Sequence, residues 1–135
     1  MTGKVLLVED EMFVRELYER VLKQAGLEVI TATDGITGLQ AADEKPNLIL
    51  LDIMMPGLNG IEVLRRLKQN ANTSSIPVVL LTNLGQESII KQALDLGASG
   101  YLMKVRITPY QIVAHVQEFL QNPNLKLKLD PNSLD

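Results

Sequence analysis

Short strand-like runs alternate with segments of helical period along almost the whole chain, and this alternation limits the folds that the chain can adopt. The strand-like runs span residues 4–8, 28–31, 48–51, 77–81 and 100–103, and most of them are continuously apolar. Segments with apolar residues at helical spacing follow at 12–25, 36–44, 60–69 and 86–96, and again after Pro109. Strands buried on both faces and helices with one apolar face produce these two patterns. The alternation therefore predicts an α/β fold, with a five-stranded parallel sheet doubly wound by helices on both faces.

Composition excludes several classes of protein. The 135 residues have the length of about one domain, and 46% of them are hydrophobic, as in a globular protein. The longest apolar run, Ile76 to Leu81, is much shorter than the roughly 20 residues of a membrane helix, and no signal peptide is visible. Cysteine is absent and the net charge is −3. We therefore expect no thiolate chemistry, no membrane association and no nucleic-acid binding through this chain, and a cytoplasmic location.

The last residues break the alternation, so we predict a domain over residues 1–121 and a C-terminal tail or linker over 122–135. Leucine and lysine alternate from Leu125 to Leu129, between Pro123 and Pro131. This period of two fits a short edge strand or a strand docked on a partner, whereas the prolines limit its length. A disordered tail and a linker to a further domain remain alternatives.

Polar residues of a few chemical types close four of the five predicted strands. Glu9 and Asp10 follow the first strand, Asp52 the third, Thr82 the fourth and Lys104 the fifth. Each residue alone fits an ordinary turn or a solvated surface position. Because parallel strands end at the same edge of a sheet, these side chains are expected to converge there. Clustered carboxylates repel one another unless a cation is bound, and their oxygens suit Mg²⁺. With the lysine, they form a setting in which a carboxylate can attack phosphorus.

Four sequence blocks resemble the receiver domains of bacterial two-component response regulators, in particular the stand-alone receivers of the chemotaxis-regulator type. The blocks are V-L-L-V-E-D-E at 5–11, L-L-D-I-M-M-P-G-L-N-G at 50–60, V-V-L-L-T at 78–82 and L-G-A-S-G-Y-L-M-K at 96–104. The resemblance covers residues 4–120, and the block at 50–60 is the most specific of the four. It implies a flavodoxin-like strand order 2-1-3-4-5 and a phosphoprotein that takes part in phosphorelay signal transduction rather than an enzyme.

The resemblance also implies a role for each residue at the sheet edge. Asp52 would accept a phosphoryl group from the phosphohistidine of a sensor histidine kinase or a phosphotransfer protein. Asp10, Asp52 and the backbone carbonyl of Met54 would bind Mg²⁺, and Glu9 would act through water. Thr82 and Lys104 would each contact a phosphoryl oxygen, and Tyr101 would turn inward as the second switch residue beside Thr82. The face of the last two helices and the last strand would then change shape, bind a downstream effector protein and offer a possible homodimer contact.

The chain departs from the family pattern at Val105, where most members have proline after the lysine. A cis bond before a non-proline residue costs about 2.5–4 kcal/mol. We therefore predict a trans Lys104–Val105 bond and an altered loop before Thr108.

Other functions compete with the phosphorylated receiver. A degenerate receiver that acts as a phosphorylation-independent docking module would not need the set of Asp10, Asp52, Thr82 and Lys104. An aspartate-nucleophile phosphohydrolase usually carries D-x-D after its first strand, and the sequence around Asp52 lacks that pattern. A flavodoxin-like electron carrier would need a phosphate-binding loop where this chain has acidic residues, which would repel the phosphate of FMN.

Overall fold

The computed structural model describes residues 3–83, 85–104 and 106–122, and its centre is a parallel sheet of five strands in the order β2-β1-β3-β4-β5. The strands are β1 (Lys4–Val8), β2 (Glu28–Ala32), β3 (Leu48–Asp52), β4 (Val78–Thr82) and β5 (Gly100–Met103). Every pair of neighbours is parallel. The predicted fold class and strand order are therefore confirmed.

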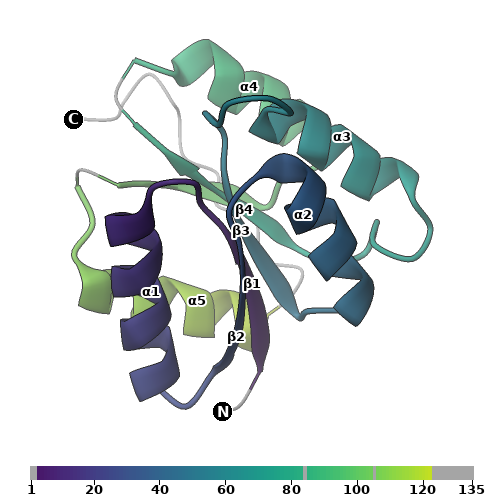
Figure 1. Cartoon of the computed structure of the whole chain (residues 1–135). Coiled ribbons are helices and arrows are strands. Elements are labelled where there is room, and N and C mark those ends of the chain that lie inside the picture. The colour runs from purple at the N-terminus through teal and green to yellow at the C-terminus, as the bar shows by residue number, and fades with distance from the viewer. Residues whose placement is uncertain (1–2, 84, 105, 123–135) are drawn as a thin grey trace.

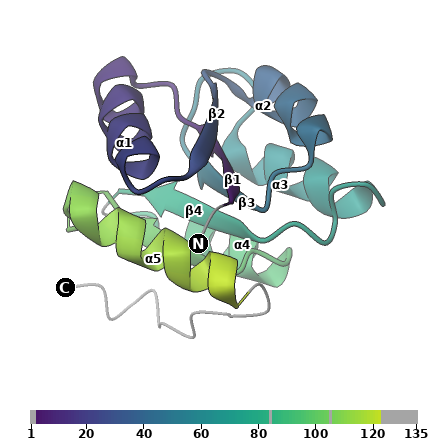
Figure 2. The ribbon, with the colours of Figure 1, turned by 90° about the horizontal axis from the view of Figure 1, so that it is seen from below.

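Helices cover both faces of this sheet (Figures 1 and 2). They are α1 (Met12–Gln24), α2 (Gly35–Ala41), the 3₁₀ turn η1 (Ala42–Glu44), α3 (Gly60–Gln69), α4 (Glu87–Asp95) and α5 (Pro109–Gln121). One apolar core lies between the sheet and α2, α3 and α4, and a second lies between the sheet and α1 and α5. Successive residues of a strand face opposite sides, so each strand supplies both cores.

The central strands are apolar without interruption because both of their faces are buried. Every residue of β3 and β4 is buried, whereas β2 at the edge of the sheet keeps an exposed Glu28 and three half-exposed residues. Both strands end one residue later than predicted, so that Asp52 and Thr82 are their last residues, and β4 also begins one residue later, at Val78. The backbones of Asp52 and Thr82 take part in the sheet, and this pairing fixes the positions of their Cα atoms.

Most helix ends follow local sequence signals. Gly26 has a φ of +89° just after α1, as a left-handed residue after a helix should. Thr108 caps α5 through a reciprocal capping box with Gln111, and Pro109 is its first helical residue. One prediction needs correction: residues 36–44 are not a single helix. The α-helix ends at Ala41 and a 3₁₀ turn continues to Glu44. Lys45, the residue before Pro46, leaves the right-handed helical region with a φ of +56°.

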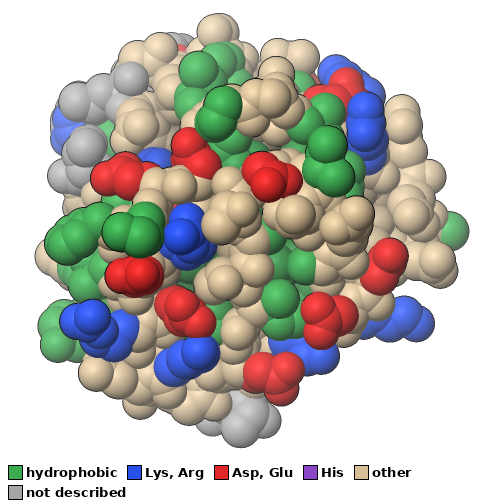
Figure 3. All heavy atoms as spheres, viewed as in Figure 1, with side chains coloured by type: hydrophobic (Ala, Val, Ile, Leu, Met, Phe, Trp, Pro, Cys, Tyr) green, Lys and Arg blue, Asp and Glu red, His purple; other side chains and the backbone are tan. Residues whose placement is uncertain are grey.

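Two predictions concern residues outside those that the structure describes. The Lys104–Val105 bond includes Val105, and the predicted tail from 122 to 135 has only its first residue in the described part. Helix α5 ends at Gln121, the last residue of the predicted domain. Among the described residues, no helix has the length and apolar character to cross a membrane. The face in Figure 3 mixes acidic, basic and hydrophobic side chains, and no continuous basic patch is visible on it.

Candidate functional site

The strand register brings the predicted polar residues to one edge of the sheet. Val8 pairs with Leu51, so Glu9 and Asp10 follow β1 beside the end of β3. Asp52 pairs with Leu81, and Thr82 pairs with Met103, the residue before Lys104. Residues from four strands thus gather at neighbouring carboxyl ends, where ligands bind in open α/β sheets.

Three carboxyl groups form the centre of this edge. One carboxylate oxygen from each of Glu9, Asp10 and Asp52 lies within 4.8 Å of the others. Glu9 and Asp52 are 0% and 2% exposed, while Asp10 is exposed to solvent. Three hard oxygen donors at this spacing, one of them open to water, fit Mg²⁺, which uses few carboxylates and keeps several waters. These residues therefore fit the predicted metal ion.

Lys104 is the cation that faces these carboxylates. Its Nζ lies 3.0 Å from Glu9 Oε1 and 3.4 Å from Asp52 Oδ2. Burial lowers the pKa of Lys104, but the attraction of Asp52 and Glu9 outweighs it, so the pKa is raised above its usual value. One ammonium cannot neutralise two buried carboxylates. Burial, reinforced by repulsion from Glu9 and opposed by Lys104, accordingly raises the pKa of Asp52 from 3.8 to about 8.

The carboxylate of Asp52 is held at both of its oxygens. Oδ1 accepts a hydrogen bond of 3.1 Å from the backbone N–H of Met54, and Oδ2 faces Lys104. The side chain of Met54 itself is 53% exposed. Asp52 is therefore oriented before any partner binds, and the turn that orients it includes the backbone whose carbonyl was predicted to bind the metal.

The loop after Asp52 folds back tightly on the end of β3. Gly57 has a φ of +73°, and the N–H of Gly60 donates a 2.8 Å hydrogen bond to the carbonyl of Ile53. A Cβ on Gly60 would lie 2.5 Å from the carbonyl oxygen of Asp52, closer than atoms can approach. Asn59 caps α3 by accepting from the N–H of Glu62. Glycine at position 60 thus allows α3 to begin directly against the strand that carries Asp52.

Arg15 fixes the path of the acidic loop after β1. Its Nη1 donates to the carbonyl oxygen of Glu9 at 3.0 Å and to that of Asp10 at 3.3 Å. The second carboxylate oxygen of Glu9 accepts from the N–H of Glu11 at 3.1 Å. The two acidic residues are therefore held through their backbone by a side chain from α1.

Thr82 and Tyr101, the predicted switch residues, are both buried, at 1% and 2% exposure. The hydroxyl of Thr82 lies 2.9 Å from Gln86 Oε1 and 3.0 Å from the carbonyl oxygen of Asn83. The ring of Tyr101 belongs to the core on the α4 side of the sheet. Thr82 thus makes its hydrogen bonds within the loop that leads to α4, and the ring of Tyr101 already lies inward.

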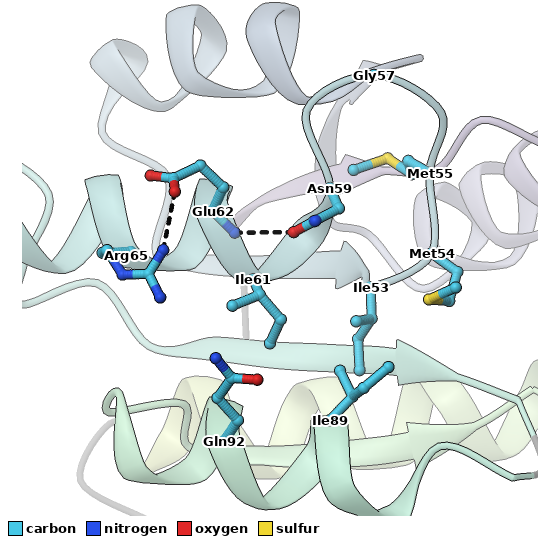
Figure 4. A pocket seen from close by; sticks show the side chains of 10 residues that line it. All are labelled: Ile53, Met54, Met55, Gly57, Asn59, Ile61, Glu62, Arg65, Ile89 and Gln92. Carbon is cyan, nitrogen blue, oxygen red and sulfur yellow. Dashed lines mark hydrogen bonds and ion pairs between the residues drawn. The ribbon is translucent and has the colours of Figure 1, made fainter.

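A groove of about 580 Å³ lies beside the site, between the loop after β3, the start of α3 and α4. In Figure 4, Ile53 and Ile61 point toward Ile89 of α4, and Glu62 is paired with Arg65. Two residues of α4, Ile90 and Ala93, are fully buried, and the half-buried Ile89 and Leu94 pack against the same core.

Comparison with known proteins identifies the family. The family model described as the response regulator receiver domain matches residues 5–117. The chain belongs to this family. The receiver domain is 40% identical over 123 residues to the phosphate regulon transcriptional regulatory protein PhoB of Pseudomonas aeruginosa, which covers 90% of this chain and 53% of PhoB. It is 37% identical over 126 residues to the alkaline phosphatase synthesis transcriptional regulatory protein PhoP of Bacillus subtilis, covering 93% of this chain and 51% of PhoP. The chain spans about half the length of these relatives.

Solved structures agree with this assignment. A putative response regulator from Chloroflexus aurantiacus superposes with a TM-score of 0.82 at 31% identity, covering 90% of this chain and 100% of that one. The chemotaxis protein CheY4 of Vibrio cholerae gives a TM-score of 0.80 at 28% identity, covering 87% of this chain and 98% of that one. The predicted membership of the receiver family is therefore confirmed.

The geometry at this edge of the receiver domain also contains two residues that the sequence analysis did not name. Arg15 and Gln86 contact the acidic loop and Thr82, respectively. Glu9 is also paired directly with Lys104, and its expected contact with the metal ion through water stays a prediction. For Gln86, the one signal in the sequence was its position, four residues after Thr82 and at the start of a predicted helix.

Proposed function

We propose that this receiver domain accepts a phosphoryl group on Asp52 from a phosphohistidine. The buried, doubly held carboxylate of Asp52 facing Lys104 is the observation that carries this proposal. One carboxylate oxygen attacks phosphorus and forms an acyl phosphate. The P–N bond to the histidine breaks, and its electron pair returns to the imidazole. The family membership supports this chemistry over that of a phosphohydrolase or an electron carrier.

The other residues at the edge bind the ions and oxygens of this reaction. Asp10, Asp52, the carbonyl of Met54 and, through water, Glu9 would hold Mg²⁺, which when bound supplies positive charge beside the phosphoryl oxygens. Lys104 donates to one of these oxygens and Thr82 to another. Lys104 must give up part of its contact with Asp52 and Glu9 to do so, and the added charge of the phosphoryl group, about −1.5 to −2, compensates for that loss.

Phosphorylation would change the surface formed by α4, β5 and α5. Thr82 contacts Gln86, the residue before α4, and Tyr101 belongs to β5. Both switch residues are therefore connected to the elements that form this surface. Helix α4 has two fully buried residues, whereas β5 and α5 have four each, and a groove lies on its α3 side. We therefore expect α4 to be the element of this surface that costs least to displace. An effector protein, or a second copy of the chain, would bind the changed surface. We place the domain at residues 1–121 and treat 122–135 as a tail or linker.

Mass spectrometry after incubation with acetyl phosphate and Mg²⁺ tests the proposal. The carboxylate attacks phosphorus, and acetate leaves with the electron pair of the broken P–O bond. We expect one added phosphoryl group on the wild-type chain and none on Asp52→Asn. An unchanged mass of the folded wild-type chain would favour a docking module instead, and continuous release of phosphate from added monoesters would favour a phosphohydrolase.

We also propose where the phosphohistidine protein docks. A groove of about 260 Å³ includes Lys104 and is lined by Phe13 and Leu17 of α1 and by Ile107 before α5. The side chain of Phe13 is 72% exposed beside it. A large apolar side chain exposed next to a reactive group is typical of a protein-binding surface.

Replacing Phe13 with alanine is therefore expected to slow phosphotransfer from a phosphohistidine protein about tenfold or more, because an aromatic contact is lost. The rate with acetyl phosphate should fall much less. Ile36→Ala is the matched control, because Ile36 is 59% exposed on α2, which covers the other face of the sheet. Equal losses with both donors in Phe13→Ala would place the docking surface elsewhere.

A further inference from the structure

The hydroxyl of Thr82 is committed to the loop after β4. It lies within hydrogen-bond distance of two acceptors, Gln86 Oε1 at 2.9 Å and the carbonyl oxygen of Asn83 at 3.0 Å. A hydroxyl carries one proton and can satisfy only one good acceptor at a time. Whenever the Thr82 hydroxyl donates to Gln86 or to Asn83, it cannot donate to a phosphoryl oxygen on Asp52.

Gln86 is built into this arrangement by a second contact. The same Oε1 accepts a 3.0 Å hydrogen bond from the backbone N–H of Asn83. Gln86 is half-buried and immediately precedes α4. Its side chain therefore ties the end of β4 to the beginning of α4, the two segments that must separate or shift if Thr82 moves.

The other switch residue does not need to move in the same way. Tyr101 is 2% exposed, so its ring is inward while Thr82 is still bonded to Gln86. Of the two switch residues, Thr82 is therefore the one whose present hydrogen bond, to Gln86, competes with a bond to a phosphoryl group.

We propose that Gln86 is a positioning residue that withholds the Thr82 hydroxyl from the phosphoryl group until Asp52 is phosphorylated. This inference rests on the proposed function and deepens it. Phosphorylation supplies a charged acceptor, which forms the stronger hydrogen bond. The Thr82 hydroxyl then donates to the phosphoryl oxygen instead of to the neutral amide oxygen of Gln86. Release of Gln86 then frees the first turn of α4, so that the charge on Asp52 is transmitted to the α4 surface through one side chain.

The test uses Gln86→Met, which keeps the length of the side chain and removes its Oε1 acceptor, so that the adjacent carbonyl of Asn83 is the remaining acceptor of Thr82. We expect the rate of phosphorylation by acetyl phosphate to rise about three- to tenfold, the equivalent of one neutral hydrogen bond. Gln86→Glu keeps an acceptor at the same place and should show no such rise. Gln92→Met is the matched control, because Gln92 is an exposed glutamine of the same helix.

A double-mutant cycle with Thr82→Val distinguishes this role from a general effect on the loop. Without the hydroxyl, Gln86→Met should leave the rate unchanged. A slower Gln86→Met, or the same gain in both backgrounds, would overturn the proposal.

Hydrogen exchange of the Asn83 amide gives a readout that needs no phosphorylation. We expect this amide to be protected in the wild-type chain and to exchange several times faster in Gln86→Met, because its acceptor is lost. Equal exchange in the two proteins would refute the contact itself. If the wild-type chain took up no phosphoryl group, the proposed function would fail, while the exchange measurement would still decide whether Gln86 holds this loop.

Discussion

Replacing Lys104 with methionine is expected to lower the free energy of unfolding of the metal-free protein by about 3–5 kcal/mol at pH 8, the range found when one partner of a buried ion pair is removed. Its ammonium faces Glu9 at 3.0 Å and Asp52 at 3.4 Å, and both carboxylates are almost fully buried. Methionine fills much of the same space but leaves the buried carboxyl groups of Glu9 and Asp52 without a cation. For a chain of this size, the loss corresponds to a melting temperature lower by roughly 10–18 °C.

The loss should depend on pH and on Mg²⁺. Because Lys104 lowers the pKa of Asp52, its removal raises that pKa above about 8 and the variant keeps the proton at pH 8. The variant should therefore be destabilised more at pH 9, where the wild-type carboxyl is largely ionised and paired with Lys104, than at pH 8. Added Mg²⁺ should restore part of the loss at pH 8, because the ion supplies the missing positive charge. Thermal melts at both pH values, with and without Mg²⁺, measure these effects.

Lys91→Met is the control for this variant, because Lys91 is exposed on α4. We expect its melting temperature to stay close to that of the wild-type chain. A Lys104→Met variant as stable as this control would mean that the ammonium does not compensate the buried carboxylates, and the electrostatic account of the site would be wrong.

The positions of the site residues could be predicted from the sequence because they depend on two periodic features. The apolar runs fix where each strand ends, and parallel strands end on the same side of the sheet. Glu9, Asp52 and Thr82 were therefore placed at one edge before any contact was known. The sheet order was implied by the family resemblance rather than by these patterns, since nothing in the apolar runs states which strands are neighbours.

The contacts between these residues could not be predicted in the same way. Strands β3 and β4 separate β1 from β5 in the sheet, yet the long side chain of Lys104 reaches Glu9 across them. Arg15 donates to backbone carbonyls of the loop after β1, and Gln86, in the loop after β4, accepts from the hydroxyl of Thr82. Such contacts depend on the path of the loops between strands and helices, and no periodicity in the sequence describes that path.

The affinity for Mg²⁺ is expected to rise steeply with pH, about tenfold between pH 6 and 7 and about fivefold between pH 7 and 8, and to level off above pH 8. Because the pKa of Asp52 is raised to about 8, its carboxyl group carries a proton in most molecules at pH 6. A bound cation requires the ionised form, so Mg²⁺ must displace that proton. The apparent dissociation constant should therefore be about fiftyfold higher at pH 6 than at pH 8. Titration calorimetry in buffers of different ionisation enthalpy measures both the affinity and the proton released.

The same pKa determines how the stability of the metal-free protein changes with pH. The folded chain keeps a proton on Asp52 up to about pH 8, whereas in the unfolded chain this carboxyl ionises near 3.8. The folded state binds more protons between these two values, so the free energy of unfolding falls as the pH rises through this window. Saturating Mg²⁺ should oppose that fall, because binding becomes stronger over the same range.

The variant Asp52→Asn distinguishes the contribution of this carboxyl to the pH dependence from that of the other acidic groups. The amide carries no charge, so the metal-free variant should lose most of the decrease in stability between pH 5 and 8, and should be more stable than the wild-type chain at pH 8. Its Mg²⁺ affinity should be weaker and nearly independent of pH over this range. A wild-type affinity that is constant between pH 6 and 8 would contradict the raised pKa, and with it the conclusion that burial and Glu9 together keep Asp52 protonated until a cation arrives.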